Sequence, residues 1–269
     1  HLVTGEEIPG RFETKPGQAF YTQMSLDLEG ISLGVEGKYI RRFINKSDPF
    51  SFDYRNELNF IPPSADVRTY RLQARYIPAT QFLGEKSVNS FIFIPLGDHL
   101  LEWKNALIFG LDGEKFYDDF DLQWTWQREN DRWVAGAMYQ TYNQSVYEGK
   151  SGNRIIRSTI PYVEYYLTWA EDKSLKTEGQ ALFTKQDKGS LYFLSMEYAW
   201  GGSWTVFGSG MYQPRSELWY PSTGLFFTKG SGRYGLSFVK QLDGYVCSGG
   251  ICRYEPAYSG FKFEFQQRL

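Results

Sequence analysis

Apolar and polar side chains alternate with a period of two residues along almost the whole length of this chain. In residues 20–28, Met24 and Leu26 fall on one face of an extended chain, and mostly polar residues fall on the other. Glu29-Gly30 then predicts a tight turn, after which residues 31–39 repeat the alternation. Successive side chains of a strand point to opposite faces, so the pattern predicts strands with one apolar and one polar face.

Runs of the same kind predict about 15 strands and an all-β fold, because no stretch keeps a helical period for more than about two turns. The predicted strands lie near residues 20–28, 31–39, 50–60, 67–77, 88–96, 100–110, 116–127, 132–143, 155–169, 175–185, 190–200, 203–212, 219–228, 233–242 and 258–269.

The length of the predicted strands favours a membrane-spanning protein over a water-soluble one. They extend to about 10 to 12 residues, whereas strands of soluble sandwiches usually have about 5 or 6, and a tilted strand crosses a bilayer in about 9 to 11. Aromatic residues make up 18% of the chain. Those placed near strand ends, as in interfacial girdles, are Tyr39, Tyr76, Trp103, Trp124, Trp126, Trp133, Trp169, Trp200, Trp204, Trp219 and Tyr220.

We therefore expect an antiparallel transmembrane β-barrel of the outer-membrane type, with about 14 to 16 strands visible. The alternative is a soluble, aromatic-rich, carbohydrate-binding sandwich in which the rings are core residues. A barrel of this size has a lumen too wide for side chains alone to fill.

The lengths of the connections predict a topology. Short links at Glu29-Gly30, 61–65, 97–98, 128–131, 170–174, 201–202 and 229–232 mostly alternate with longer ones, such as 78–86, 144–153, 213–218 and 243–256. Outer-membrane barrels have short periplasmic turns, so we expect a periplasmic C-terminus.

Under this topology the first visible strand also runs toward the periplasm, which predicts one more strand upstream. Either residues 1–16 supply it, or the chain is the C-terminal part of a larger barrel, which we favour. We accordingly divide the chain into residues 1–18, a loop or a remnant of an upstream strand, and residues 19–269, the transmembrane barrel.

Composition argues against several functions. A net charge of −2 gives no reason to expect a nucleic-acid partner. Only His1 and His99 are present, so neither a zinc site nor a histidine-based catalytic triad is expected. Asp119 and Asp121 could form a carboxylate pair of a glycosidase or bind a cation, but polar lining of a barrel wall is the stronger interpretation. We expect no enzyme activity and no cofactor.

Charged residues on the polar faces are candidates for lining the lumen, and they have mixed sign. They are Lys38, Arg71, Arg75, Asp119, Asp121, Arg132, Glu164, Glu178, Glu197, Lys262 and Glu264. Such a set permits salt-bridged ladders that fill a closed interior, or a wet pore with weak ion selectivity.

Two further motifs lie near the C-terminus. Cys247 and Cys252 enclose a Gly-Gly bend in a connection expected outside the membrane, where a disulfide is favoured over free thiols or a metal site. The last strand resembles the C-terminal insertion signal of outer-membrane barrels, although it ends in leucine rather than phenylalanine. Its apolar face consists of Phe261, Phe263, Phe265 and Leu269.

Three segments carry a resemblance to a family: 149–152, 184–189 and, above all, 247–257. Over residues 110–269 the chain resembles an uncharacterised family of Bacteroidota outer-membrane barrel proteins. The resemblance implies the fold and the bacterial outer membrane as location, and it transfers no catalytic or binding residue.

We expect a porin-like passive channel or uptake pore. The alternative is a structural or accessory barrel subunit of a larger outer-membrane secretion or nutrient-uptake complex. The expected partners are outer-membrane lipid, the barrel-insertion machinery and, in the alternative, other outer-membrane or periplasmic subunits.

Overall fold

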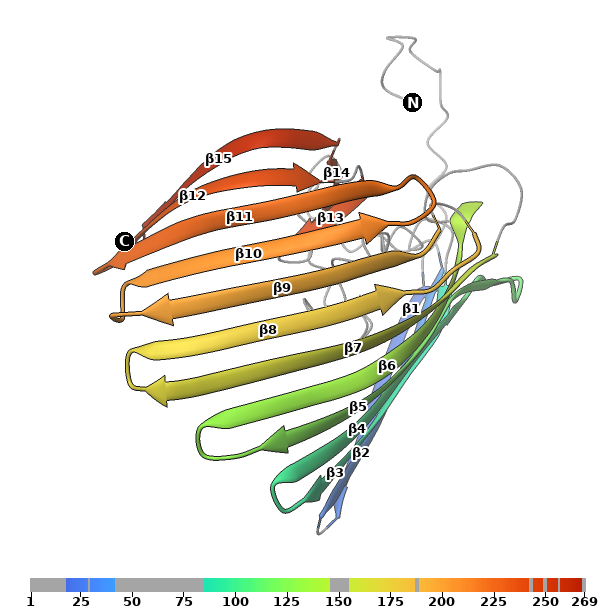
Figure 1. Ribbon diagram of the computed structural model, residues 1–269. Helices are drawn as coiled ribbons and strands as arrows, with labels where there is room; N and C mark the ends of the chain where they lie inside the picture. The colour runs from blue at the N-terminus through green and yellow to red at the C-terminus, as the bar shows by residue number, and fades with distance from the viewer. Residues whose placement is uncertain are drawn as a thin grey trace.

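The computed structural model describes most of the chain as β-strands joined in one sheet (Figure 1). The residues it describes are 18–28, 30–41, 85–145, 155–186, 189–241, 244–248, 251–255 and 257–267. Predicted strands 50–60 and 67–77 lie outside these residues. In the described part, no helix is long and apolar enough to cross a membrane.

Thirteen strands form a single antiparallel sheet in the order β1-β2-β3-β4-β5-β6-β7-β8-β9-β10-β11-β12-β15. Their bounds are β1 Gln18–Leu28, β2 Ile31–Arg41, β3 Glu85–Leu96, β4 His99–Phe109, β5 Lys115–Gln127, β6 Asp131–Asn143, β7 Ile155–Ala170, β8 Lys173–Leu182, β9 Leu191–Trp200, β10 Trp204–Gln213, β11 Leu218–Lys229, β12 Gly232–Gln241 and β15 Tyr258–Gln267. The all-β, antiparallel prediction is confirmed.

Tight turns join the strands at one end of the sheet. Gly30 turns β1 into β2 with a φ of 86°, and Gly97 turns β3 into β4 with a φ of 61°. Such positive φ values are strained for residues with a Cβ, so glycine suits both turns. Leu28 pairs with Ile31 across the first of these turns, as expected for the tight turn predicted at Glu29-Gly30.

The two ends of the sheet differ, as the sequence predicted. Short turns also join β5 to β6, β7 to β8, β9 to β10 and β11 to β12, and the longer connections lie at the opposite end. The end of β15 lies at the short-turn end (Figure 1). Of the short links expected from the sequence, 61–65 falls outside the described residues.

The 13-stranded sheet is curved but not closed among the described residues (Figure 1). Within the described strands its edges are β1 and β15, and each is hydrogen-bonded to one neighbour there. Both edges run from the long-connection end to the short-turn end, because the sheet is antiparallel and has an odd number of strands. Antiparallel closure would therefore require an odd number of additional strands between them.

One connection differs from the expected loop. Residues 243–256 contain a two-stranded hairpin, β13 Gly244–Ser248 and β14 Ile251–Glu255, which forms a separate small sheet. Strands of five residues around a Gly-Gly pair are too short to show a convincing alternation, although Gly-Gly is itself a hairpin signal.

Candidate functional site: the two faces of the sheet

The sheet has an outer face and an inner face, and the alternating exposure of successive side chains in β5 distinguishes them. Phe120 and Leu122 are 41% and 42% exposed, whereas the intervening Asp119 and Asp121 are 1% and 4% exposed. We call the side of Phe120 the outer face and the side of Asp119 the inner face. Directly paired residues of neighbouring strands share a face, so the register extends both definitions across the sheet.

The outer face is apolar from β1 to β15. Of the 31 large hydrophobic side chains that are exposed in the described residues, all but Tyr21, Leu218 and Tyr258 occupy outer-face positions. The largest exposed apolar patch of a typical soluble monomer covers only a few hundred Å². An apolar surface that crosses 13 strands therefore needs a covering of lipid or protein.

Charged residues at outer-face positions of the described strands are confined to the strand ends. They are Arg41, Lys86, Lys115, Asp118, Asp131, Arg157, Lys173, Lys229 and Lys240. Between these ends the outer face is uncharged, which suits a hydrocarbon layer better than water.

Aromatic rings form a band along the outer face at the short-turn end. Neighbouring ring centroids in this aromatic band lie 4.5 to 6.5 Å apart. Its members are Trp169, Tyr198, Trp200, Trp204, Phe227, Tyr234 and Phe265.

A second set of aromatic pairs lies at the other end of the outer face. Tyr212 stacks on Trp219 at 4.7 Å, and Phe238 meets Phe261 edge to face at 5.6 Å. Along β10, Trp204 and Tyr212 are separated by about 26 Å at about 3.3 Å per residue. With a strand tilt of about 40°, this corresponds to a height of about 20 Å, close to the lipid-facing band of outer-membrane barrels.

Two residues expected in the girdles lie elsewhere. Tyr220 is on the inner face and only 8% exposed, because it alternates with the outward Trp219 in β11. Trp103 is on the outer face but in the middle of β4, where it meets Phe120 edge to face at 6.1 Å. Tyr76 lies outside the described residues.

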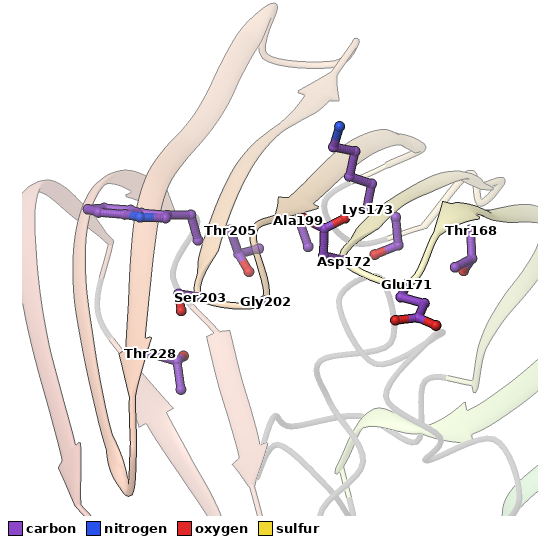
Figure 2. Close-up of a pocket in the computed structure, with 11 residues that line it drawn as sticks. Thr168, Glu171, Asp172, Lys173, Ala199, Gly202, Ser203, Thr205 and Thr228 are labelled. Atoms are coloured by element: carbon purple, nitrogen blue, oxygen red, sulfur yellow. The ribbon is translucent and has the colours of Figure 1, made fainter.

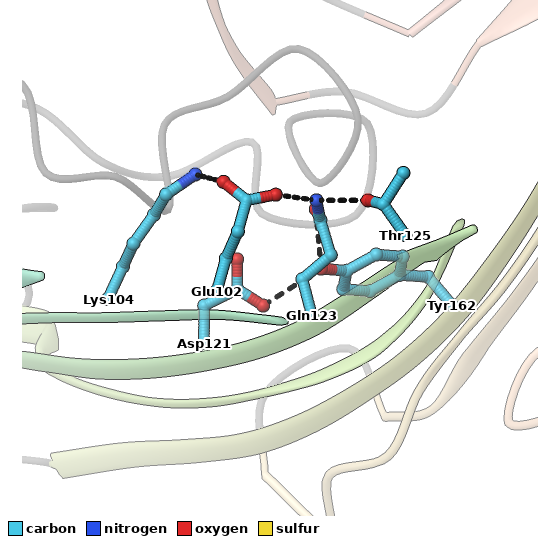
Figure 3. A network of polar contacts seen from close by, with 6 residues as sticks. All are labelled: Glu102, Lys104, Asp121, Gln123, Thr125 and Tyr162. Atoms are coloured by element: carbon cyan, nitrogen blue, oxygen red, sulfur yellow. Dashed lines mark hydrogen bonds and ion pairs between the residues drawn. The ribbon is translucent and has the colours of Figure 1, made fainter. Parts of the chain in front are cut away.

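The inner face carries a polar network on β4, β5 and β7, with side chains that rise from the sheet on one side (Figure 3). Lys104 Nζ lies 3.3 Å from Glu102 Oε1, and Gln123 Nε2 donates a hydrogen bond to Glu102 Oε2. The Tyr162 hydroxyl donates to Asp121 Oδ1 at 3.0 Å. Ionised groups with so little exposure need such partners, since an unpaired buried charge is costly.

Asp119 is also held by hydrogen bonds. Its Oδ1 accepts the backbone N–H of Ala106 at 2.9 Å, and its Oδ2 accepts the Tyr117 hydroxyl at 3.2 Å. The side-chain amide of Gln140 donates in turn to the Tyr117 hydroxyl at 2.9 Å. The carboxylates predicted from alternation are thus fixed within a wall of amides and tyrosines.

A second polar cluster occupies β6, β7 and β8. Glu164 and Glu178 are direct partners in the register and are 1% and 3% exposed. Opposed carboxylates repel each other, and nearby donors offset the repulsion. The Tyr166 hydroxyl donates to Glu164 Oε2 at 2.5 Å, and Lys176 Nζ lies 3.7 Å from Glu178 Oε2. The Arg132 guanidinium lies 4.2 Å above the Tyr166 ring.

The other predicted lumen residues are more dispersed. Glu197 is on the inner face of β9 and exposed. Lys262 and Glu264, on the inner face of β15, form an ion pair at 2.5 Å. Lys38 occupies an inner-face register position opposite Ser87, and its side chain is not among those described. Arg71 and Arg75 lie outside the described residues.

Sequence reasoning missed several members of these clusters. Glu102 and Lys104 alternate with Leu101 and Trp103, a signal that was present in the strand predicted at 100–110. Tyr162, Tyr166 and Lys176 also join the inner face. Tyrosine has an apolar ring and a polar hydroxyl, so its type alone does not assign it to either face.

A hydrophilic depression of about 340 Å³ lies at the short-turn end, where the turns after β7 and β9 meet (Figure 2). Hydroxyl groups dominate its wall, and the β7–β8 turn adds two carboxylates and an ammonium group. Its lining residues are Thr168, Glu171, Asp172, Lys173, Ser174, Ala199, Gly202, Ser203, Trp204, Thr205 and Thr228. Its side chains can form hydrogen bonds with polar solutes at the short-turn end of the sheet.

The structure describes part of the cysteine motif and part of the last-strand motif. Cys247 and Cys252 are direct partners in the β13–β14 register; their side chains are not among those described. Phe261, Phe263 and Phe265 lie on the outer face and are 74%, 71% and 55% exposed, whereas Leu269 lies outside the described residues. Across the residues that the structure covers, no group of three or more His, Cys, Asp or Glu side chains could hold a metal ion.

These features define an all-β protein with a curved antiparallel sheet, an apolar outer face and a polar inner face. The chain belongs to a family of unknown function (DUF6029), whose model matches residues 96–269. This confirms the expectation of an uncharacterised family.

Comparison with solved structures finds porins of Rhodopseudomonas blastica. A triple mutant is 10% identical with a TM-score of 0.43, covering 83% of this chain and 84% of the porin. Another mutant is 9% identical with a TM-score of 0.41, covering 91% of this chain and 89% of the porin. No curated protein matches the chain.

Proposed function

We propose that this chain forms a β-barrel in the bacterial outer membrane and acts as a passive channel or uptake pore. The observation that carries the proposal is the outer face, which is apolar and uncharged between strand ends across all 13 strands of the sheet. Strands can cross a bilayer because neighbouring strands satisfy one another's backbone hydrogen bonds. The aromatic band and the opposite aromatic pairs supply the two interfacial girdles of such a barrel.

A soluble sandwich explains these faces less well. It would bury its apolar face and expose its polar one, yet Asp119 is 1% exposed while Leu194 is 67% exposed. The inversion is the arrangement of a barrel whose apolar side faces lipid and whose polar side faces the lumen.

The inner face supports a polar lumen of mixed charge. Its carboxylates, amides and tyrosines are joined by hydrogen bonds, and Lys104, Arg132 and Lys176 lie among the acidic groups. Such a wall suits hydrophilic solutes and favours weak rather than strict ion selectivity.

We assign the short-turn end and the C-terminus to the periplasm, and the long connections to the cell exterior. In this orientation the β13–β14 hairpin lies outside the cell. Residues directly opposite each other on antiparallel strands have Cα atoms about 4.5 to 5.5 Å apart, which suits a disulfide. We therefore propose a disulfide between Cys247 and Cys252.

The proposal is tested by single-channel recording of the detergent-purified full chain in a planar bilayer. A folded sample should give stable current steps, and the reversal potential in a salt gradient should report weak selectivity. Detergent alone and a heat-unfolded sample serve as controls. Silence from demonstrably folded protein would contradict the channel and favour the accessory-subunit alternative.

A further inference from the structure

Four glycines of the inner face lie directly opposite aromatic residues of a neighbouring strand. The pairs are Gly34 with Phe91, Gly136 with Tyr162, Gly224 with Phe207, and Gly235 with Phe226. They occur at four strand junctions, between β2 and β3, β6 and β7, β10 and β11, and β11 and β12. This recurrence points to a shared role.

In each pair the aromatic ring occupies the space where the opposite residue would carry a Cβ. The three atoms nearest to a Cβ built on Gly34 are all ring atoms of Phe91, and all three would lie within 3.0 Å of it. A Cβ built on Gly235 would fall within 3.0 Å of two ring atoms of Phe226, and the next nearest atom is the Cβ of Glu264 at 3.5 Å. The rings therefore lie across the glycine backbone, against the wall of the sheet.

Neighbouring contacts hold one of these rings in its position. Phe226 stacks on Phe207 with ring centroids 5.6 Å apart, and the Arg233 guanidinium lies 4.2 Å above the Phe226 ring. A ring against the wall takes less of the lumen's cross-section than a ring that stands away from it. Glycine at the opposite position is what gives the ring this place.

We propose that these glycines set the free width of the lumen, and hence the size limit for hydrophilic solutes, by letting inner-face rings lie against the wall. The inference rests on the proposed channel function. Gly34, Gly136, Gly224 and Gly235 are then size-determining residues, although none of them presents a functional group to a solute.

The test compares unit conductances in planar bilayers. Gly34→Ala and Gly235→Ala push the opposite ring toward the lumen and should each lower the conductance. Gly208→Ala is the matched control: Gly208 lies on the outer face of β10, and a Cβ there meets nothing within 4 Å. It should conduct like the wild type.

Removing the ring distinguishes a narrowed lumen from a general disruption of the fold. The double variant Gly34→Ala/Phe91→Ala should regain at least wild-type conductance, and this also covers the case in which Gly34→Ala alone fails to fold. Wild-type conductance in Gly34→Ala and Gly235→Ala would overturn the inference while leaving the channel intact. An equal loss in Gly208→Ala, or no recovery in the double variant, would overturn it too. A silent wild type would instead contradict the channel itself.

Discussion

Replacing Met196 by arginine should destabilise the protein strongly in lipid. Met196 lies on the outer face of β9 and is 55% exposed. It is four residues from both Tyr192 and Trp200, about 13 Å from each at about 3.3 Å per residue, and so lies midway between the aromatic girdles. Arginine at the midplane of an outer-membrane barrel costs about 2 to 4 kcal/mol.

The expected loss amounts to a roughly 30- to 1,000-fold drop in the folding equilibrium constant, at tenfold per about 1.4 kcal/mol. It can be measured by urea titration of protein folded into phospholipid vesicles. Met196→Leu controls for the loss of the methionine and should change the free energy by less than about 1.5 kcal/mol. Gln267→Arg controls for depth, because Gln267 ends β15 beyond Phe265, and should cost no more than about 1 kcal/mol.

A Met196→Arg variant as stable as Met196→Leu would contradict a lipid-facing position for Met196. An exposed position on a soluble protein typically tolerates such a change within about 0.5 kcal/mol. Equal stabilities would mean that water, and not lipid, covers the outer face.

Three further predictions concern the ends and the wall of the barrel. An impermeant reductant on intact cells should open the disulfide between Cys247 and Cys252, as read by thiol labelling and mass spectrometry; protection until the outer membrane is opened would reverse the assigned sides. Phe263→Asp should lower the amount of folded protein in the outer membrane, seen as loss of the heat-modifiable band. Assembly at the wild-type level would mean that the last strand does not act as the insertion signal. Glu178→Gln, which removes one of two opposed carboxylates, should shift the reversal potential toward anions, and an unchanged potential would place Glu164 and Glu178 away from the ion path.

The strands could be predicted from the sequence because their signal is local. Alternation over nine or more residues assigns both the strand and its two faces, and β5 shows this directly with Asp119 and Phe120 on opposite sides. Turn residues such as Gly30 and Gly97 then set the register of each hairpin. Four buried acidic residues of the wall, Asp119, Asp121, Glu164 and Glu178, followed from the same alternation.

The rest of the site could not be predicted in this way. The sequence does not assign Tyr162 and Tyr220 to the inner face, because a tyrosine has an apolar ring and a polar hydroxyl and can lie on either face of a barrel wall. The pairing of Gly34 with Phe91 joins residues far apart in sequence, and only the register of β2 on β3 brings them together. The alternation of side chains within one strand does not show which residues of another strand will pair with it.

A spin-label scan of β9 would show whether the outer face of the sheet lies in lipid. Residues 191–200 would each be replaced by cysteine in a Cys247→Ser/Cys252→Ser background and labelled after folding into vesicles. Collision rates with lipid-soluble oxygen should alternate with a period of two, high at the positions of Leu194 and Met196 and low at Phe193 and Ser195. Rates without this alternation, or high rates at the inner-face positions, would contradict a sheet whose outer face lies in lipid.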